Sequence, residues 1–125
     1  MAITRTQLFS VPVSDQDRAL RFYVDTLGFN LLSDAEMGPD MRWLLVSPPG
    51  AETAITLVTW FESMPAGSLK GIVLETDDLE GDIATLTEKG VIFEGGLQDA
   101  PWGRFTTFND PDGNGIVLQA STSRG

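Results

Sequence analysis

The residues in this sequence that most suggest chemistry lie in the stretch NDPDGNGIVLQAS near the C-terminus. Asp110, Asp112, Asn114 and Gly115 match the first, third, fifth and sixth positions of a calcium-binding loop. The twelfth position of such a loop needs a bidentate glutamate, and here it is Ser121. Because the strongest ligand is missing and a β-like apolar run follows, the sequence favours a turn between two strands over a cation site.

Nucleophilic chemistry has few candidate residues. The chain contains no histidine and no cysteine, which excludes a Ser-His-Asp triad, a thiolate nucleophile and disulfide bonds. The phosphate-binding patterns GxGxxG and GxxxxGK[ST] are also absent. A carboxylate base is conceivable at Glu52, Glu75 or Asp99, but no spacing distinguishes any of them from a solvated surface charge. The catalytic residues are therefore unknown, and whether the protein is an enzyme stays open.

The charge balance limits the partners. With 18 acidic and 8 basic residues the formal net charge is −10, so no nucleic-acid partner is expected, because phosphate-backbone binding needs clustered Lys and Arg. An acidic surface serves solubility, and an acidic cleft that attracts a cationic small molecule is the alternative. The sequence contains no membrane-spanning run and no signal peptide, so we expect no membrane partner and a cytoplasmic location, with which the lack of cysteine agrees.

A helical unit flanked by strands must position any site. In residues 11–30, VPVSDQDRALRFYVDTLGFN, a strand ends and Ser14 or Asp15 can cap a helix that carries an apolar stripe. Gly28 follows at the place where a helix ends in a left-handed residue. An extended run then begins at Phe29.

The same plan recurs in residues 72–93, IVLETDDLEGDIATLTEKGVIF, with Thr76 or Asp77 as the expected cap and Gly90 as the stop. Gly90 lies 62 positions after Gly28. This spacing indicates two related halves in one chain.

The chain length indicates that residues 1–125 form one domain with room for a core. Its first module is expected at about residues 1–62 and its second at about 68–121, with a linker at 62–68. Strands are predicted at residues 4–13, 29–33, 41–46, 53–60, 70–75, 91–93, 105–108 and 115–120, with a turn at 34–40 and a loop at 95–101.

The stretches VSDQDRALRFYVDTLGF, DDLEGDIATLTEKGV, PWG and NDPDGNGIVLQ resemble the vicinal oxygen chelate superfamily over nearly the whole chain. That superfamily includes glyoxalase I, extradiol dioxygenases, and bleomycin- and fosfomycin-resistance proteins. The resemblance implies an α+β fold of two tandem βαβββ modules that form a curved open mixed sheet around a cleft. It also implies a homodimer, because relatives often form the cleft across paired chains.

The metal enzymes of this superfamily place four ligands, usually His, Glu or Gln, on strands that face the cleft. No residue at the matching positions here is a usual ligand of a divalent cation. The resemblance thus implies a protein without a metal or another cofactor. By motif, the four positions are Leu8, Ile55, Gly71 (or Lys70, if the second half is slipped by one residue) and Val117.

A cleft without metal ligands, lined by Trp, Phe and Leu, could stack or cage a flat or cationic molecule. Since alternate strand residues share a face, Ser10, Leu57 and Gln119 are expected to face the cleft together with the lost ligand positions. Gln119 would orient a ligand by hydrogen bonding. The expected ligand-binding residues are Leu8, Ser10, Trp43, Ile55, Leu57, Trp102, Phe108, Val117 and Gln119.

The resemblance and the aromatic residues together predict a metal-independent protein of the glyoxalase/bleomycin-resistance type that sequesters a neutral or cationic aromatic small molecule. The alternative is a lyase, isomerase or dioxygenase-like enzyme of the same superfamily that uses a carboxylate or an unrecognised metal site. A third reading is an interaction module with a vestigial cleft. The sequence does not distinguish a drug from a metabolite as the ligand.

Overall fold

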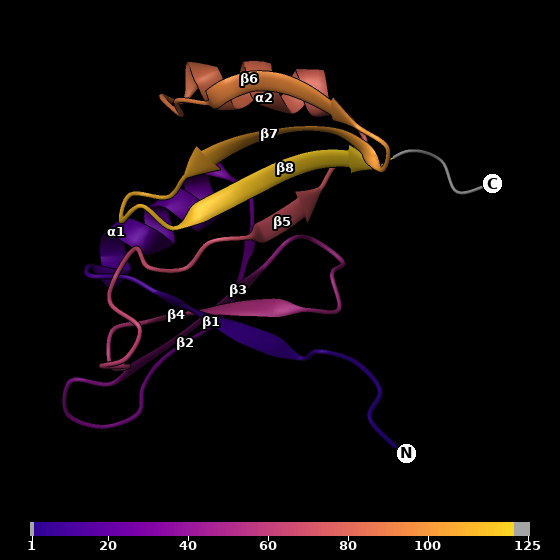
Figure 1. The fold of residues 1–125 in the computed structure, drawn as a ribbon. Coiled ribbons are helices and arrows are strands. Elements are labelled where there is room, and N and C mark those ends of the chain that lie inside the picture. Colours follow the sequence, from indigo (N-terminus) through magenta and orange to yellow (C-terminus); the bar gives the residue numbers. More distant parts are fainter. Residues whose placement is uncertain (1, 122–125) are drawn as a thin grey trace.

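The computed structural model describes residues 2–121, which fold into two groups of strands with the helices beside them (Figure 1). The first module contains β1 (Leu8–Pro12), α1 (Gln16–Leu20), η1 (Arg21–Thr26), β2 (Asn30–Glu36), β3 (Arg42–Ser47) and β4 (Ala54–Val58). The second contains β5 (Ile72–Glu75), α2 (Leu79–Glu88), β6 (Glu94–Ala100), β7 (Gly103–Asn109) and β8 (Gly115–Ser121). None of these helices is long and apolar enough to cross a membrane.

Each module forms its own four-stranded sheet, with strand orders β1-β4-β3-β2 and β5-β8-β7-β6. In each sheet the first pair is parallel and the other two pairs are antiparallel. The predicted α+β fold of two βαβββ modules is confirmed. Within residues 2–121 the hydrogen-bonded strands form two four-stranded mixed sheets, one from each module.

Short polar side chains begin both helices. Asp15 caps α1, since its carboxylate accepts a hydrogen bond from the Arg18 backbone N–H at 3.0 Å, and this bond lowers the pKa of Asp15. The second cap is Asp78, which accepts from the Gly81 N–H at 3.1 Å. The prediction of Thr76 or Asp77 as this cap is therefore wrong. The Thr76 hydroxyl instead accepts from the backbone N–H of Asp78.

The first helix widens after its first turns. Residues 21–26 form the π-helical segment η1, in which the Leu27 N–H donates to the carbonyl of Phe22, five residues earlier, at 3.0 Å. Both predicted glycine stops hold, with φ of 79° at Gly28 and 93° at Gly90. From cap to glycine the first unit spans residues 15–28 and the second only 78–90. The π turn therefore absorbs one residue that the second helix lacks.

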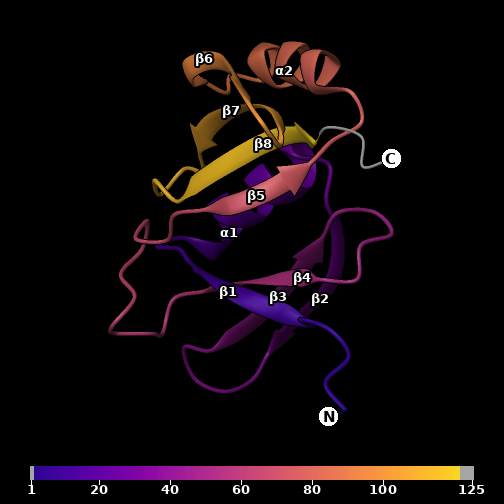
Figure 2. The same ribbon diagram turned by 45° about the vertical axis from the view of Figure 1, so that its right-hand side comes forward.

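One hydrophobic core joins the two modules. We call the face of each sheet that packs into this core its inner face, and the other its outer face. In Figures 1 and 2, α1 lies between the two sheets. Gln16 at its start donates to the carbonyls of Arg42 and Leu57 at 2.9 and 2.8 Å, which ties α1 to the first sheet. The inner-face residues in the core include Val11, Leu44, Val46, Ile55, Leu57, Ile72, Leu74, Phe108, Ile116 and Leu118.

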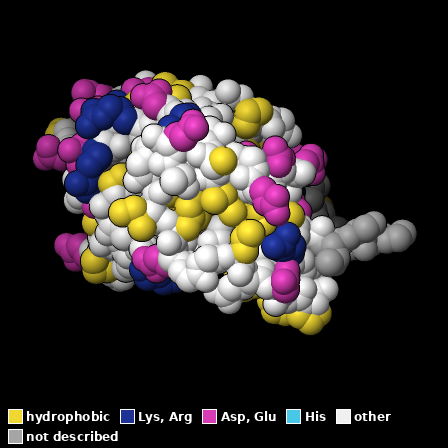
Figure 3. Space-filling model, turned by 90° about the horizontal axis from the view of Figure 1, so that it is seen from above, with side chains coloured by type: hydrophobic (Ala, Val, Ile, Leu, Met, Phe, Trp, Pro, Cys, Tyr) yellow, Lys and Arg dark blue, Asp and Glu magenta, His cyan; other side chains and the backbone are white. Residues whose placement is uncertain are grey.

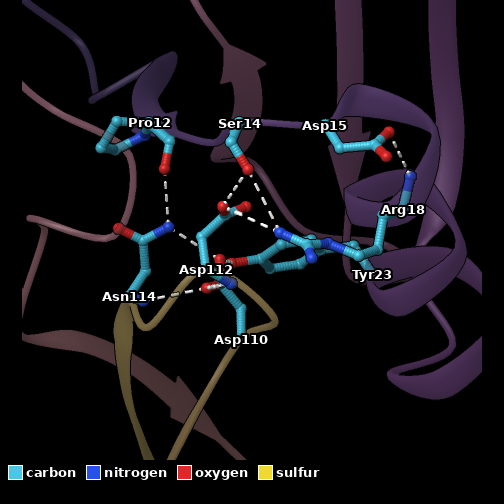
Figure 4. Close-up of polar contacts among 8 residues, drawn as sticks. All are labelled: Pro12, Ser14, Asp15, Arg18, Tyr23, Asp110, Asp112 and Asn114. Atoms are coloured by element: carbon cyan, nitrogen blue, oxygen red, sulfur yellow. Dashed lines mark hydrogen bonds and ion pairs between the residues drawn. The ribbon is translucent and has the colours of Figure 1, made fainter.

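A polar cluster, which we call the module junction, fastens α1 and η1 to the turn between β7 and β8 (Figure 4). One oxygen of buried Asp110 accepts from the Tyr23 hydroxyl at 2.9 Å and from the Asn114 side chain at 2.8 Å. Its other oxygen accepts from the backbone N–H groups of Asp112 and Asn114. Burial, and then the charge of Asp110, raises the pKa of Tyr23. The predicted turn is confirmed, and its carboxylates are used to hold the fold.

The junction also holds the chain that links the modules. Asn114 donates through its side chain to the carbonyl of Pro12 at 2.8 Å, and the Gly67 backbone N–H donates to the same carbonyl at 3.2 Å. Arg18 pairs with Asp112 at 3.0 Å. At Gly67, where φ is +80°, a Cβ atom would lie 2.1 Å from the Asp112 carbonyl oxygen. Only glycine fits where the linker crosses the turn.

The edge strands differ most from the prediction. The structure has β6 where the sequence predicts a loop at residues 95–101, and it has no strand at residues 91–93. Nearly all residues of β6 are exposed, so the alternation of apolar and polar residues is missing. Gly95 and Gly96 also have positive φ, next to a register shift between β6 and β7. β2 likewise continues past residue 33 into the predicted turn.

Candidate functional site

The parallel pairing of β1 with β4 decides which residues share the outer face of the first sheet. Leu8 is registered with Ala54, and Ser10 with Thr56. The Ser10 and Thr56 hydroxyls are 2.9 Å apart and share a hydrogen bond. Because registered residues of neighbouring strands point to the same face, Thr56 takes the position that the sequence assigned to Ile55.

Ile55, Leu57 and Phe108 lie on the inner faces, so the prediction that Ile55 and Leu57 share a face with Leu8 is wrong. Leu57 is completely buried in the core. Ile55 and Phe108 line a cavity between the two sheets. The prediction failed because the first module has one extra residue before β4. The connection between β3 and β4 spans residues 48–53, whereas that between β7 and β8 spans 110–114. A shift of one residue moves a strand's side chains to the opposite face.

Trp43 belongs to the same outer face as Leu8, because Leu45, two residues further along β3, is registered with Thr56. The Trp43 side chain is half-buried. The preceding residue, Arg42, contacts Asp34 of β2 at 2.9 Å and Asp17 of α1 at 2.7 Å. These contacts fix the start of β3, and the hydrogen bond from Arg42 lowers the pKa of Asp34. We define the first outer face as Leu8, Ser10, Trp43, Leu45 and Thr56.

The outer face of the second sheet is built around β8. Val117 and Gln119 alternate with the core residues Ile116 and Leu118, and both are half-buried. The Gln119 side chain donates to the Ser121 hydroxyl at 3.2 Å. Among their registered neighbours on β5 and β7, the sequence named only Glu75, as a conceivable carboxylate base. The two-residue period of β7 could have indicated Phe105 and Thr107. We define the second outer face as Val73, Glu75, Phe105, Thr107, Val117 and Gln119.

Glu75 is the carboxylate of the second outer face. Its two oxygens accept from the backbone N–H and the hydroxyl of Ser121, at 2.8 and 2.6 Å. These bonds tie the end of β5 to the end of β8. The carboxylate is thus held by the sheet itself, as a structural clasp at one end of this face.

The remaining tryptophans lie elsewhere. Trp102 is in the turn between β6 and β7, with 59% of its surface exposed. Trp60 follows β4, and its ring centroid is 6.3 Å from that of Phe61. The predicted contact residues are therefore distributed as follows: Leu8, Ser10 and Trp43 on the first outer face, Val117 and Gln119 on the second, Ile55, Leu57 and Phe108 inside, and Trp102 on a turn.

The side chains at the four family ligand positions do not fit a divalent metal. With the corrected register these residues are Leu8, Thr56, Gly71 and Val117. They offer one neutral hydroxyl, which Ser10 already uses, where such ions require imidazole, carboxylate or thiolate donors. Across residues 2–121 no three His, Cys, Asp or Glu side chains gather in a way that could hold a metal ion.

The surface charge is mixed but mainly acidic. On the face shown in Figure 3, basic side chains lie beside acidic ones, and hydrophobic side chains gather near the centre. The ion pairs of Arg18, Arg42 and Arg104 agree with this view, since each arginine contacts a carboxylate. An anionic ligand would have to compete with these carboxylates.

Comparisons with known proteins give consistent results. The model of the Glyoxalase/Bleomycin resistance protein/Dioxygenase superfamily matches residues 5–118. The chain is similar to TnmS3, described as an antibiotic binding protein from Streptomyces sp. CB03234, with 53% identity, a TM-score of 0.92, and coverage of 98% of this chain and 99% of that one. A superfamily member from Sphaerobacter thermophilus DSM 20745 is 41% identical, with a TM-score of 0.89 and coverage of 97% and 100%. The uncharacterized protein YetH of Bacillus subtilis is 38% identical over 113 residues, which are 88% of this chain and 92% of YetH.

Proposed function

This chain belongs to the glyoxalase/bleomycin resistance protein/dioxygenase superfamily, and from that premise we propose that it binds a small organic molecule and sequesters it without chemical change. The similarity to TnmS3, described as an antibiotic binding protein, supports binding as the function. The donor set supports a metal-independent role, because Leu8, Thr56, Gly71 and Val117, at the positions where the family's enzymes hold a metal, supply only one hydroxyl.

The observation that carries this proposal is the composition of the two outer faces. Their apolar and aromatic side chains include Trp43 and Phe105. The polar groups beside them are Ser10, Thr56, Thr107, Gln119 and the Glu75 carboxylate, which Ser121 already engages. Ligand sites typically combine such an apolar lining with a small number of polar groups that fix orientation. We propose that Trp43 provides the main stacking surface and that Gln119 orients the ligand.

We propose further that the protein is a homodimer in which the first outer face of one chain meets the second outer face of its partner. The support is geometric: the inner faces of both sheets belong to one core cluster, so the outer faces of a single chain point away from that core. Pairing two chains would place an apolar face on each side of a ligand. Two equivalent sites per dimer would result from the symmetry.

The proposed ligand is a neutral or cationic aromatic molecule. A ring stacked on an indole gains about 0.5–1.5 kcal/mol beyond its buried area, and a cation over the ring face about 0.5–2 kcal/mol. An anion is disfavoured, because Arg42, next to Trp43, is already held by Asp17 and Asp34. The net charge of −10 acts in the same direction.

A fluorescence titration with three-ring probes tests the ligand class. We expect the cation proflavine and the neutral acridone to bind, and 9-anthracenecarboxylate to bind at least about tenfold more weakly. Trp43→Ala should weaken proflavine binding about tenfold or more with an unchanged circular dichroism spectrum. Trp102→Ala tests the second predicted tryptophan, and Trp60→Ala is the control. Tight binding of the anion alone, or wild-type affinity in both Trp43→Ala and Trp102→Ala, would refute this ligand class.

Native mass spectrometry of freshly purified protein tests assembly and metal content together. We expect a dimer of the 13.5 kDa chain, without a bound transition metal, because the outer faces supply a single carboxylate, Glu75, which already accepts hydrogen bonds from Ser121. Elemental analysis after dialysis provides the independent check. About one Zn, Fe, Ni or Mn per chain would contradict the metal-independent role, and a monomer at micromolar concentration would contradict the dimer.

A further inference from the structure

A cavity that is partly open to solvent lies between the inner faces of the two sheets and is not used by the proposed function. This inter-sheet cavity has a volume of about 620 Å³. Both modules contribute to its lining, which is mainly apolar. The walls include Phe9 and Ile55 of the first sheet, Phe108 and Leu118 of the second, Phe29 after η1, and Leu86 of α2.

The size of the inter-sheet cavity sets it apart from a packing defect. Native cores contain few voids larger than a water molecule, whereas ligand pockets typically measure about 300–1,000 Å³. Apolar walls that face such a space lose packing contacts unless another molecule fills it. Two modules that share one core therefore leave room here for another molecule.

The rim of the inter-sheet cavity is built from stiff segments. Pro48 and Pro49, in the connection between β3 and β4, border it, and the proline ring fixes their φ angle. Thr26 and Leu27, at the end of η1, border it as well, and π-helical turns frequently occur at functional sites. A preformed rim reduces the ordering cost of binding.

The charged groups at the rim already have partners. The Glu75 carboxylate accepts from Ser121, and that of Asp82 accepts from the hydroxyl of Thr76. The Lys89 ammonium donates to the carbonyl of Asp25 at 2.9 Å and so satisfies the end of η1. A charged group on a ligand would have to displace these partners or remain buried without one.

We infer that the inter-sheet cavity is a second binding site, specific for a neutral, largely apolar molecule built on aromatic rings. Phe9, Phe29 and Phe108 line the space and provide ring surfaces for offset or edge-to-face stacking. On β8 the site is separate from the outer face, since Leu118 and Val117 are neighbours that point to opposite sides of the sheet. Val73 and Glu75 of the edge strand β5 border the cavity as well as the second outer face. It lies within one chain and does not require a partner.

The test uses the neutral dye N-phenyl-1-naphthylamine, whose fluorescence rises in apolar surroundings. In the Trp43→Ala background, in which the proposed outer-face site is disabled, we expect it to bind the full chain in a saturable way, with one dye per chain. Leu118→Phe adds bulk inside the cavity, and Thr85→Trp adds it from the exposed side of α2. Each should weaken dye binding at least about tenfold. The matched control Val117→Phe adds bulk on the outer face and should leave dye affinity within about twofold of wild type.

Two further readouts make the test decisive. The sulfonated relative 8-anilinonaphthalene-1-sulfonate carries the same rings with a negative charge, and it should bind at least about tenfold more weakly. Leu118→Phe should melt near the wild-type temperature, because the added ring enters free space; a much lower melting temperature indicates overpacking and contradicts the inference. Equal losses in Leu118→Phe and Val117→Phe, or equal affinity for the two dyes, would overturn it. Failure of the outer-face proposal, measured with proflavine and Trp43→Ala, does not change these outcomes.

Discussion

Replacing Asp110 with alanine is expected to lower the free energy of unfolding by about 3–5 kcal/mol, since each buried donor left without a partner costs about 1–3 kcal/mol. The carboxylate accepts from the Tyr23 hydroxyl, the Asn114 side chain and two backbone N–H groups. Removing it leaves several donors unsatisfied at one place. Urea unfolding followed by circular dichroism measures the change.

The control for this prediction is Asp99→Ala, because Asp99 is 80% exposed and pairs with Arg104 at the surface. Surface pairs contribute about 0–1 kcal/mol, so Asp99→Ala should be nearly neutral. Tyr23→Phe removes one donor to Asp110 and should cost about 1–2 kcal/mol. The double variant Tyr23→Phe/Asp110→Ala should be less destabilised than the sum of the single variants. Strict additivity would show that Tyr23 and Asp110 are not energetically coupled. Equal effects of Asp110→Ala and Asp99→Ala would show that the module junction contributes little.

Gly67→Ala is expected to destabilise the protein by roughly 3–4 kcal/mol, combining strain at positive φ with a steric clash. The Cβ atom would lie 2.1 Å from the Asp112 carbonyl oxygen, so either the linker or the turn between β7 and β8 must move. Either movement weakens the hydrogen bond from the Gly67 N–H to the Pro12 carbonyl. Urea unfolding again gives the magnitude.

Gly50→Ala is the matched control for Gly67→Ala. Gly50 has a similar φ of +73°, but a Cβ atom there would meet nothing within 4 Å. Its cost should be the conformational part alone, about 1–2 kcal/mol. The difference between the two variants measures the close approach of the linker to the turn. Identical losses would mean that the turn yields without resistance.

The repeated units were predictable because their signals are local. A capping side chain, an apolar stripe and a glycine stop each depend on neighbours a few residues away. In this way the first cap was narrowed to Ser14 or Asp15, and Gly28 and Gly90 were identified as stops. The edge strand β6 was missed, since its exposed residues carry no alternating pattern. The bond between Tyr23 and Asp110 was also beyond prediction, because it depends on how the two modules dock.

The repeat alone could not predict which face of the sheet each residue of the central strands occupies. Two single-residue differences separate the modules: the π turn in the first helix and the longer connection between β3 and β4. Each changes the offset between matching positions, and a one-residue error exchanges the two faces of a strand. For this reason Ile55 was placed beside Leu8 when Thr56 is the residue there. The pairing register, and not the spacing of motifs, identifies the outer faces.

The module junction also determines when this protein can finish folding during its synthesis. The side chain of Asn114 bonds to the carbonyl of Pro12, 102 positions earlier in the chain. At about 5–20 residues per second, a ribosome needs about 5–20 s to make the residues between them. Throughout that time the turn between β7 and β8, which contacts the aromatic side of the first helix, has not yet been synthesised. A translation product that stops before residue 110 therefore presents Tyr23 and Phe22 to the chaperones that bind exposed apolar surface.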